Sequence, residues 1–261
     1  MVFRISFALA VLLVPWAGHA QSDLLTDRNG DGILSFTAFG DSITYGLGDG
    51  IAPGETIDPL PIPPRPMGYP ERVEALTTLA VDNDGIPGES FMISGLDRLP
   101  GVATGFAADV LFFLEGSNDA WQKVDPSDYE RALQKAVNVT IASGRAPVLL
   151  TLPPPSASHI GLRLFTDAYT LKVKHIAFIN EVDLVDLDRA WRTTCVDLDE
   201  CQLYNLPDGF HPNTLGYDAM AQTVLATMYG IDIFSAGGAA ELEAALGLAA
   251  GSVVVRPDPA A

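Results

Sequence analysis

A serine at the end of an apolar run is the residue best placed for nucleophilic chemistry. Residues 33–39 are apolar, β-branched and aromatic, which predicts a buried strand, and the run breaks at Gly40 two residues before Ser42. Open α/β folds build their sites at this carboxyl edge, where the N–H groups that open the next helix can hold an anion. Ser42 is therefore a candidate nucleophile, although Gly-Asp-Ser alone is also common turn chemistry.

A hydroxyl nucleophile needs a base, and a group that orients the base. Of the four histidines, His211 has Asp208 three residues before it, a spacing that can place both side chains on one turn. A solvated loop is the alternative for such a pair. His19 lies in the N-terminal segment, while His159 follows a proline-rich loop and His175 falls in a predicted helix, so structural or solvated roles are expected for the last two.

Two further loops offer donors for an oxyanion. Asn118 follows a buried strand predicted at 110–115, and its side chain carries an amide. Gly88 lies in a tight loop of two glycines around a proline, whose backbone N–H groups can point outwards. Each residue on its own is equally compatible with an ordinary turn.

Strands and helices alternate along the chain, which predicts a parallel sheet with right-handed crossovers. In such a sheet all strand-to-helix loops emerge at one edge, so the loops at 40–46, 83–90, 116–121 and 207–213 can converge. Strands are expected at 33–39, 79–81, 110–115, 147–152 and 184–187, and helices at 70–78, 126–143, 162–182 and 215–229, with one possible further helix at 239–248.

Four short motifs occur in a fixed order over residues 33–230: Gly40-Asp41-Ser42-Ile43-Thr44, Gly88 within 83–88, Gly116-Ser117-Asn118-Asp119, and Asp208-Gly209-Phe210-His211. Together they resemble the blocks of the GDSL esterases, the SGNH hydrolase superfamily, with Ile43 where the namesake motif has Leu. The resemblance implies an α/β fold, a flavodoxin-like three-layer sandwich with about five parallel strands and helices on both faces.

The resemblance also implies roles for these residues. Ser42 would attack an ester carbonyl, with His211 as base and Asp208 orienting the imidazole. The backbone N–H groups of Ser42 and Gly88 and the amide of Asn118 would hold the oxyanion. The expected function is a serine carboxylester hydrolase that cleaves small acyl or aryl esters through an acyl-enzyme and needs no metal or organic cofactor. A carbohydrate O-deacetylase or a lysophospholipase with the same machinery remains an alternative.

Three features are expected to shape the substrate pocket. The loop 46–68, rich in Gly and Pro, leaves from the serine turn itself, and a second proline-rich loop spans 153–161. Loops of this length without secondary structure are uncommon unless they cover something. Trp121 follows the Asn118 motif and is a candidate for substrate binding, with ordinary core packing as the alternative.

The N-terminus has the pattern of a secretory signal. Arg4 precedes an apolar run of twelve residues, and Gly18-His19-Ala20 matches a small-residue cleavage site. An uncleaved membrane anchor is the alternative, but twelve residues fall short of the ~20 that span a bilayer. We expect a signal peptide at 1–20, a hydrolase domain at 21–235, an Ala/Gly-rich C-terminal tail at 236–261, and a secreted or periplasmic location.

Two cysteines, Cys195 and Cys201, remain in this expected exported chain. In an oxidising compartment such a pair predicts a disulfide. A metal site is the alternative, but no histidine lies between them.

The composition is that of a globular protein, with 48% hydrophobic and 18% charged residues. The formal net charge of −18 becomes −19 once the predicted signal, whose single charge is Arg4, is removed. This charge disfavours nucleic acid and anionic membrane surfaces as partners, and its simplest meaning is solubility. The expected partner is the small-molecule ester that the resemblance implies.

Residues 27–32, Asp-Arg-Asn-Gly-Asp-Gly, match the first half of a calcium-binding loop. The twelfth position, which should be a bidentate Glu, is Ala38, so a turn that leads into the strand is the favoured interpretation. This stretch alone supports a hypothesis of another class, a non-catalytic calcium-stabilised binding module.

Overall fold

A computed structural model describes residues 23–105 and 108–256. The predicted signal peptide, residues 1–20, lies outside the described residues. Among the helices that are described, none combines the length and the apolar character needed to cross a membrane.

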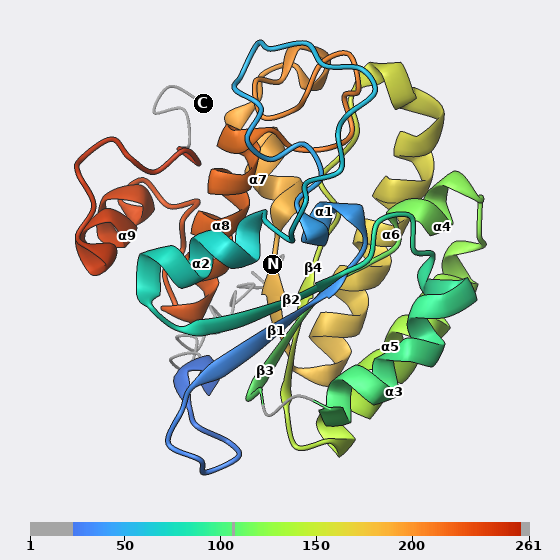
Figure 1. The fold of residues 1–261 in the computed structure, drawn as a ribbon, viewed down its shortest axis with the longest axis vertical. Helices are drawn as coiled ribbons and strands as arrows, with labels where there is room; N and C mark the ends of the chain where they lie inside the picture. Colours follow the sequence, from blue (N-terminus) through green and yellow to red (C-terminus); the bar gives the residue numbers. More distant parts are fainter. Residues whose placement is uncertain (1–22, 106–107, 257–261) are drawn as a thin grey trace, which may run out of the picture.

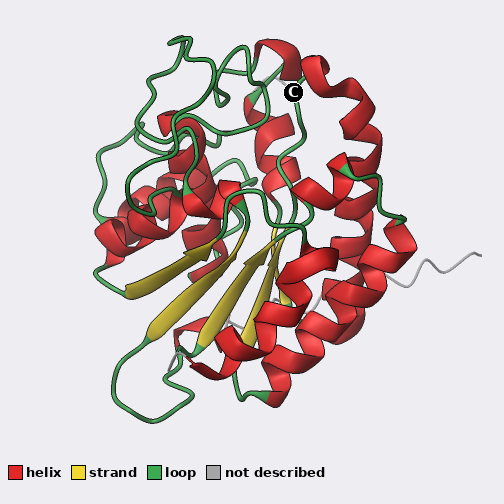
Figure 2. Cartoon of the chain, turned by 45° about the vertical axis from the view of Figure 1, so that its right-hand side comes forward, coloured by secondary structure: helices red, strands yellow, loops and turns green. Residues whose placement is uncertain are grey.

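A sheet of five parallel strands forms the centre of the molecule (Figures 1 and 2). Its order is β2-β1-β3-β4-β5, so the chain changes direction across the sheet between β1 and β3, and ligands bind at such switch points in open α/β folds. The strands are β1 (Ser35–Gly40), β2 (Ala80–Gly85), β3 (Val110–Leu114), β4 (Ala146–Leu150) and β5 (Asp183–Val185).

Helices cover both faces of the sheet, which confirms the expected layered α/β fold. One face carries α2 (Tyr69–Thr77), α7 (Leu187–Thr194) and α8 (Thr214–Met228), with α9 (Gly238–Leu246) packed on α8; the other carries α3 (Leu96–Gly105), α5 (Pro126–Ala142) and α6 (Ile160–Asn180) (Figure 1). Short turns complete the chain: α1 (Ser42–Tyr45), α4 (Ser117–Trp121), η1 (Asp23–Leu25), η2 (Phe91–Gly95, a π-helical turn), η3 (Ala157–His159) and η4 (Leu198–Glu200).

The central strands are apolar on both sides because helices bury both faces. Every residue of β3 is buried. Phe112 stacks on Phe36 of β1 with ring centroids 5.5 Å apart, and Phe113 stacks on Phe39 at 5.4 Å. These cross-strand pairs fix the register of the two strands that carry Ser42 and Asn118 at their ends.

Several element boundaries differ from the sequence-based expectation. The strand expected at 79–81 extends to Gly85, so part of the loop expected at 83–90 is strand. The strand expected at 184–187 ends at Val185, because the Asp186 carboxylate accepts the Arg189 N–H at 3.1 Å and starts α7 at Leu187. Two helices, α3 and α7, were not expected at all.

Residues 27–32 form a turn that leads into β1. The Asp27 carboxylate accepts the N–H groups of Gly30 and Gly32 at 2.6 and 2.8 Å. Buried Asp109, just before β3, accepts the N–H groups of Arg28 and Ser35 at 2.6 and 3.0 Å and so fastens the turn to the sheet. The described residues hold no group of three or more His, Cys, Asp or Glu side chains that could bind a metal ion.

Cys195 and Cys201 form a disulfide, which confirms the predicted pairing. Both are buried, and the bond closes the loop around η4 after α7.

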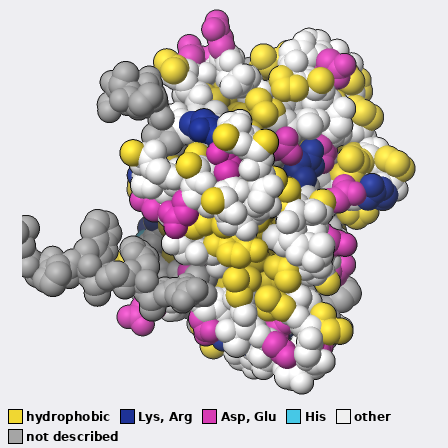
Figure 3. Space-filling model, turned by 90° about the vertical axis from the view of Figure 1, so that its left-hand side faces the viewer, with side chains coloured by type: hydrophobic (Ala, Val, Ile, Leu, Met, Phe, Trp, Pro, Cys, Tyr) yellow, Lys and Arg dark blue, Asp and Glu magenta, His cyan; other side chains and the backbone are white. Residues whose placement is uncertain are grey.

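The C-terminal segment after α8 packs on the domain. Leu242 of α9 is buried, as are Val253 and Val255. The Glu243 carboxylate accepts the N–H groups of Gly251 and Val253 at 2.9 and 3.0 Å. On the side of the molecule that carries α2 and α9, apolar side chains gather at the middle of the face and acidic ones are spread around it (Figure 3).

Candidate active site

The turn after β1 places Ser42 beyond the edge of the sheet. The Asp41 carboxylate caps α1 by accepting the Ile43 N–H at 2.9 Å, so Ser42 is the first residue of this short helix. Its own N–H has no partner inside the helix, as at any helix start. A Cβ atom on Gly40 would lie 2.0 Å from Thr44 Oγ1 and 2.4 Å from the Leu114 carbonyl oxygen, so only glycine fits this turn.

Ser42, His211 and Asp208 lie in one chain of hydrogen bonds. Ser42 Oγ is 3.0 Å from His211 Nε2, and His211 Nδ1 is 3.1 Å from Asp208 Oδ2. The same carboxylate oxygen accepts the backbone N–H groups of Phe210 and His211 at 3.0 and 2.6 Å. Burial by itself would raise the pKa of Asp208, but the hydrogen bonds and charge of His211 outweigh it and lower that pKa below its usual value.

The loop that carries Asp208 and His211 is closed by its own hydrogen bonds. Asn205 N–H donates to the His211 carbonyl at 3.0 Å, and Gly209 N–H donates to the Asn205 carbonyl at 2.6 Å. Asn213 then caps α8 by accepting the Gly216 N–H at 3.1 Å. The loop before α6 packs against it, because Ser156 N–H donates to the Gly209 carbonyl at 2.9 Å.

Asn118 joins two loops that end at the same sheet edge. Its Nδ2 donates to the Glu89 carbonyl at 2.7 Å and lies 3.5 Å from Asp41 Oδ2. Gly88, with φ +80°, directly precedes Glu89. Asn118, Gly88 and the Ser42 turn are therefore neighbours, as the convergence of the loops predicts.

Asp41 lies fully buried behind Ser42. Burial raises the pKa of Asp41 to about 6, against the hydrogen bond from Ile43 N–H, which lowers it. Asp41 thus fixes the start of α1 and also faces the amide of Asn118.

Three aromatic rings pack together, and one of them, Phe210, contacts His211. The Trp121 side chain is 51% exposed, so core packing is not its role. Its ring meets His159 edge-on at 5.2 Å and Phe210 at 6.2 Å, and Phe210 meets His211 at 5.1 Å. These rings can form one wall of a substrate pocket.

His159 has a structural role, one of the two roles expected for it, but its contact with the loop that carries Asp208 was not predicted. Its Nε2 donates to the Asp208 carbonyl oxygen at 2.7 Å, across 49 residues of sequence. The only indication in the sequence was its place in the proline-rich loop expected to line the pocket. His175, in contrast, is exposed on α6, where its Nδ1 lies 2.7 Å from Glu130 Oε1, as expected for a solvated histidine.

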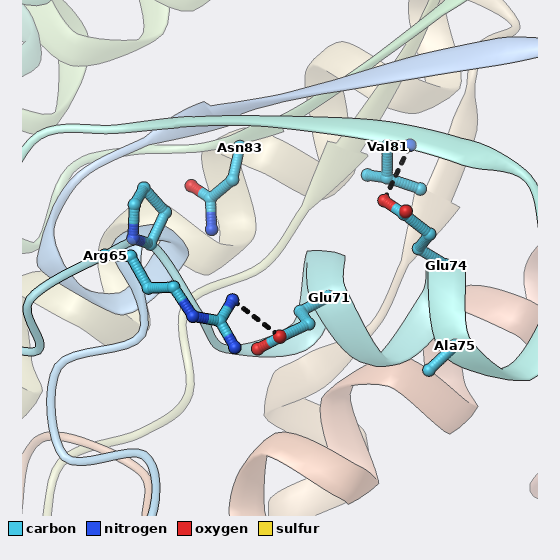
Figure 4. Close-up of a pocket in the computed structure, with 7 residues that line it drawn as sticks. Arg65, Glu71, Glu74, Ala75, Val81 and Asn83 are labelled. Carbon is cyan, nitrogen blue, oxygen red and sulfur yellow. Dashed lines mark hydrogen bonds and ion pairs between the residues drawn. The ribbon is translucent and has the colours of Figure 1, made fainter.

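A separate cavity of about 410 Å³ lies along β2 and does not include the Ser42 and His211 side chains (Figure 4). The Arg65 guanidinium, at the end of the loop 46–68, pairs with Glu71 of α2 at 2.7 Å (Figure 4). The residues that line this cavity are Arg65, Pro66, Glu71, Glu74, Ala75, Val81 and Asn83.

Residues 38–219 match the model of the GDSL-like Lipase/Acylhydrolase family, a segment that holds all four motifs and the Ser42–His211–Asp208 chain. The chain belongs to this family. It is accordingly a carboxylic ester hydrolase of the GDSL/SGNH type. A comparison with curated proteins found no match.

Solved structures of this type share the fold. A lipase/acylhydrolase from Enterococcus faecalis superposes with a TM-score of 0.58 at 20% identity, covering 76% of this chain and 96% of that one. The acetylxylan esterase Axe2 from Geobacillus stearothermophilus superposes with a TM-score of 0.60 at 22% identity, covering 77% of this chain and 96% of that one. An aryl esterase from M. smegmatis superposes with a TM-score of 0.58 at 16% identity, covering 74% of this chain and 96% of that one.

Proposed function

We propose that this GDSL hydrolase is a serine carboxylester hydrolase that cleaves small acyl or aryl esters through an acyl-enzyme. The observation that carries the proposal is the hydrogen-bond chain from Ser42 Oγ to His211 Nε2 at 3.0 Å and from His211 Nδ1 to Asp208 at 3.1 Å. A hydroxyl, a base and an orienting carboxylate in this order are the parts that acyl transfer needs.

The reaction follows from this order. His211 takes the Ser42 proton as Oγ bonds to the ester carbonyl carbon, and Asp208 stabilises the imidazolium that forms. The tetrahedral intermediate collapses when His211 gives its proton to the leaving alcohol. Water then attacks the acyl-enzyme with His211 again as base, and the carboxylic acid leaves while Ser42 regains its proton.

Donors for the oxyanion would be the backbone N–H groups of Ser42 and Gly88 and the side chain of Asn118. The Asn118 amide nitrogen carries two hydrogens. The Glu89 carbonyl accepts one of them at 2.7 Å and holds the plane of the amide. The second faces Asp41 Oδ2 in a long contact of 3.5 Å, which an oxyanion would have to replace. Such donors act most strongly where the charge develops in the transition state.

The half-exposed ring of Trp121 supports a small acyl or aryl substrate. It packs against Phe210 and His159, and Phe210 in turn contacts the imidazole of His211, so the indole would contact a part of the substrate beyond Phe210. Two structural neighbours are by name an acetylxylan esterase and an aryl esterase. A carbohydrate O-deacetylase or lysophospholipase would use the same catalytic residues, and the predicted signal and the disulfide favour a secreted or periplasmic location.

The test is hydrolysis of p-nitrophenyl acetate, butyrate and octanoate by the wild type and by Ser42→Ala. We expect turnover that falls by at least about 10³-fold in the variant, because a triad without its nucleophile keeps only residual catalysis. The ranking of the three esters by acyl-chain length separates an esterase for small acyl groups from a lipase-like enzyme. Release of acetate from an acetylated sugar identifies a deacetylase. Equal turnover by folded Ser42→Ala would contradict the proposal.

A further inference from the structure

A buried carboxyl group without a hydrogen-bond donor lies close in the sequence to Asn118, one of the proposed oxyanion donors. Glu115 follows β3, three residues before Asn118, and is 1% exposed. Within the described part of the chain, no donor group lies within hydrogen-bond distance of either carboxyl oxygen. The one side chain with which Glu115 can share a hydrogen bond is another carboxylate, Glu89. The Tyr129 hydroxyl of α5 approaches from one side, but it donates to the Glu115 backbone carbonyl at 2.9 Å.

The charged groups that face Glu115 are mostly other carboxylates: Asp41 before α1, Glu89 before η2 and Asp119 in α4. Unlike Glu115, each of these three has donors of its own. Asp41 accepts the Ile43 N–H, Asp119 accepts the Ser90 hydroxyl and the N–H groups of Phe91 and Met92, and Glu89 is bound by the Arg98 guanidinium.

The Arg98 side chain of α3 binds one member of this cluster, Glu89, and it donates hydrogen bonds to Glu89 and Asp84. Its Nε lies 3.1 Å from both Glu89 carboxylate oxygens, and its Nη1 donates to the Asp84 carbonyl at 3.2 Å. The guanidinium also lies over the Phe39 ring, 4.0 Å from its centroid. Glu115 therefore faces three other carboxylates, and it can hydrogen-bond to Glu89 only if one of the two groups carries a proton, since a carboxylate only accepts.

An ionised carboxylate in this place would be costly, since a buried charge needs a partner and hydrogen bonds. The protonated acid avoids that cost. Burial, followed by the charges of Asp41 and Glu89, raises the pKa of Glu115 well above its usual range.

We propose that Glu115 keeps its proton at neutral pH, so that the buried carboxylate cluster that includes Asp41 carries no further negative charge. A charge there would act against the negative charge that develops on the substrate, and it would add to Asp41, whose Oδ2 is 3.5 Å from the Asn118 amide. This inference rests on the proposed roles of Ser42 and Asn118, but the protonation of Glu115 can be tested without any substrate.

The first test is the infrared difference spectrum between wild type and Glu115→Gln at about pH 8, where Asp41, with its pKa of about 6, is ionised. We expect the carbonyl band of a protonated carboxylic acid in the wild type and its loss in the variant. Should Glu115→Gln not fold, Glu115→Met gives the same subtraction with an apolar side chain of similar length. An ionised-carboxylate band in the place of the acid band would overturn the proposal.

Glu243→Gln is the matched control. The Glu243 carboxylate accepts two backbone N–H groups and pairs with Arg256, and these contacts lower its pKa. Its difference spectrum should show the loss of an ionised carboxylate only.

Thermal unfolding gives a second readout, with a defined sign. Because the folded pKa of Glu115 is raised, the folded protein holds a proton that the unfolded chain releases above about pH 4.3. The contribution of Glu115 to wild-type stability therefore falls as pH rises above that value, and the substitution by Gln removes this fall. The Tm of Glu115→Gln minus that of wild type should grow more positive between about pH 5 and pH 8. For Glu243→Gln, the Tm difference from wild type should be negative and should not change over this pH range. A Tm difference for Glu115→Gln that stays constant or falls as pH rises would overturn the proposal.

The two measurements on Glu115 need no ester substrate. If no ester is hydrolysed by wild type, the proposed function fails, while the infrared and unfolding measurements still decide the protonation of Glu115.

Discussion

Asn118 has a role that a single substitution can isolate, because its amide would donate to a charge that exists only in the transition state. We expect Asn118→Ala to lower kcat by roughly 10²–10³-fold with a smaller change in KM. Asn138→Ala is the matched control, since Asn138 is exposed on α5 and accepts a hydrogen bond only from the nearby Gln134 side chain among the described contacts. An unchanged kcat in Asn118→Ala would remove this residue from the mechanism.

His159 is expected to act through the backbone of the loop that carries Asp208. His159→Ala removes the 2.7 Å hydrogen bond to the Asp208 carbonyl and the ring that packs against Trp121. One such bond is worth about 1 kcal/mol, so we expect kcat/KM to fall roughly 5- to 10-fold.

The conservative variant His159→Gln, which retains a donor, should recover part of this loss. His175→Ala is the control, because that histidine is exposed on α6 and contacts Glu130. Equal activity of wild type and His159→Ala would show that the hydrogen bond does not position Asp208.

At the level of elements, the short turn between β1 and α1 sets the position of Ser42. Gly40→Ala would place a Cβ atom 2.4 Å from the Leu114 carbonyl oxygen on the neighbouring strand, a backbone atom that cannot move away easily. We expect a loss of about 1–3 kcal/mol in the free energy of unfolding, as for other overpacked sites, and a fall in kcat as Ser42 shifts.

Gly101→Ala in α3 is the comparison for this variant. A Cβ atom there meets nothing within 4 Å, and alanine favours a helix over glycine by roughly 0.5–1 kcal/mol. This variant should be neutral or more stable in urea-induced unfolding, with unchanged activity. Equal stability of the two variants would contradict the steric argument.

Strong apolar patterns predicted the elements that hold the site. β1 and β3 are buried, and the loops after them carry Ser42 and Asn118 as the alternation of strands and helices required. Local patterns failed where a tertiary or capping contact decides the structure. α3 contains Pro100, which sequence rules treat as a helix breaker, and α7 starts at the Asp186 cap.

In the candidate site too, local patterns predicted some features, and tertiary contacts that no local pattern shows decide the others. The roles of Ser42, His211 and Asp208 were expected from residue types and short spacings, and these side chains lie within hydrogen-bond distance of one another. The contact between His159 and the Asp208 carbonyl spans 49 residues and two loops, so no local pattern encodes it. The absence of a donor group near the Glu115 carboxyl, among the described residues, likewise depends on which side chains surround it in the folded protein.

At the level of the whole molecule, the chain carries a net charge of −18, and folding brings that charge together in one domain. Mutual repulsion of like charges destabilises a compact state, and salt screens it, with a Debye length of about 10 Å at 0.1 M and about 3 Å at 1 M. The Tm should therefore rise with sodium chloride over this range.

The Cys195–Cys201 disulfide should stabilise the folded protein by an amount that does not depend on the salt concentration. By restricting a short loop in the unfolded chain it should contribute about 2 kcal/mol in the chain-entropy model, which for a domain of this size corresponds to a Tm shift of roughly 4–8 °C. Dithiothreitol should lower the Tm of wild type by that amount and leave the double variant Cys195→Ser/Cys201→Ser, which already melts lower, unaffected. Because the chain contains only these two cysteines, an equal effect of the reductant on both proteins would contradict a stabilising disulfide.

A salt-induced rise in Tm of the same size in both proteins would show that charge screening and the disulfide contribute independently.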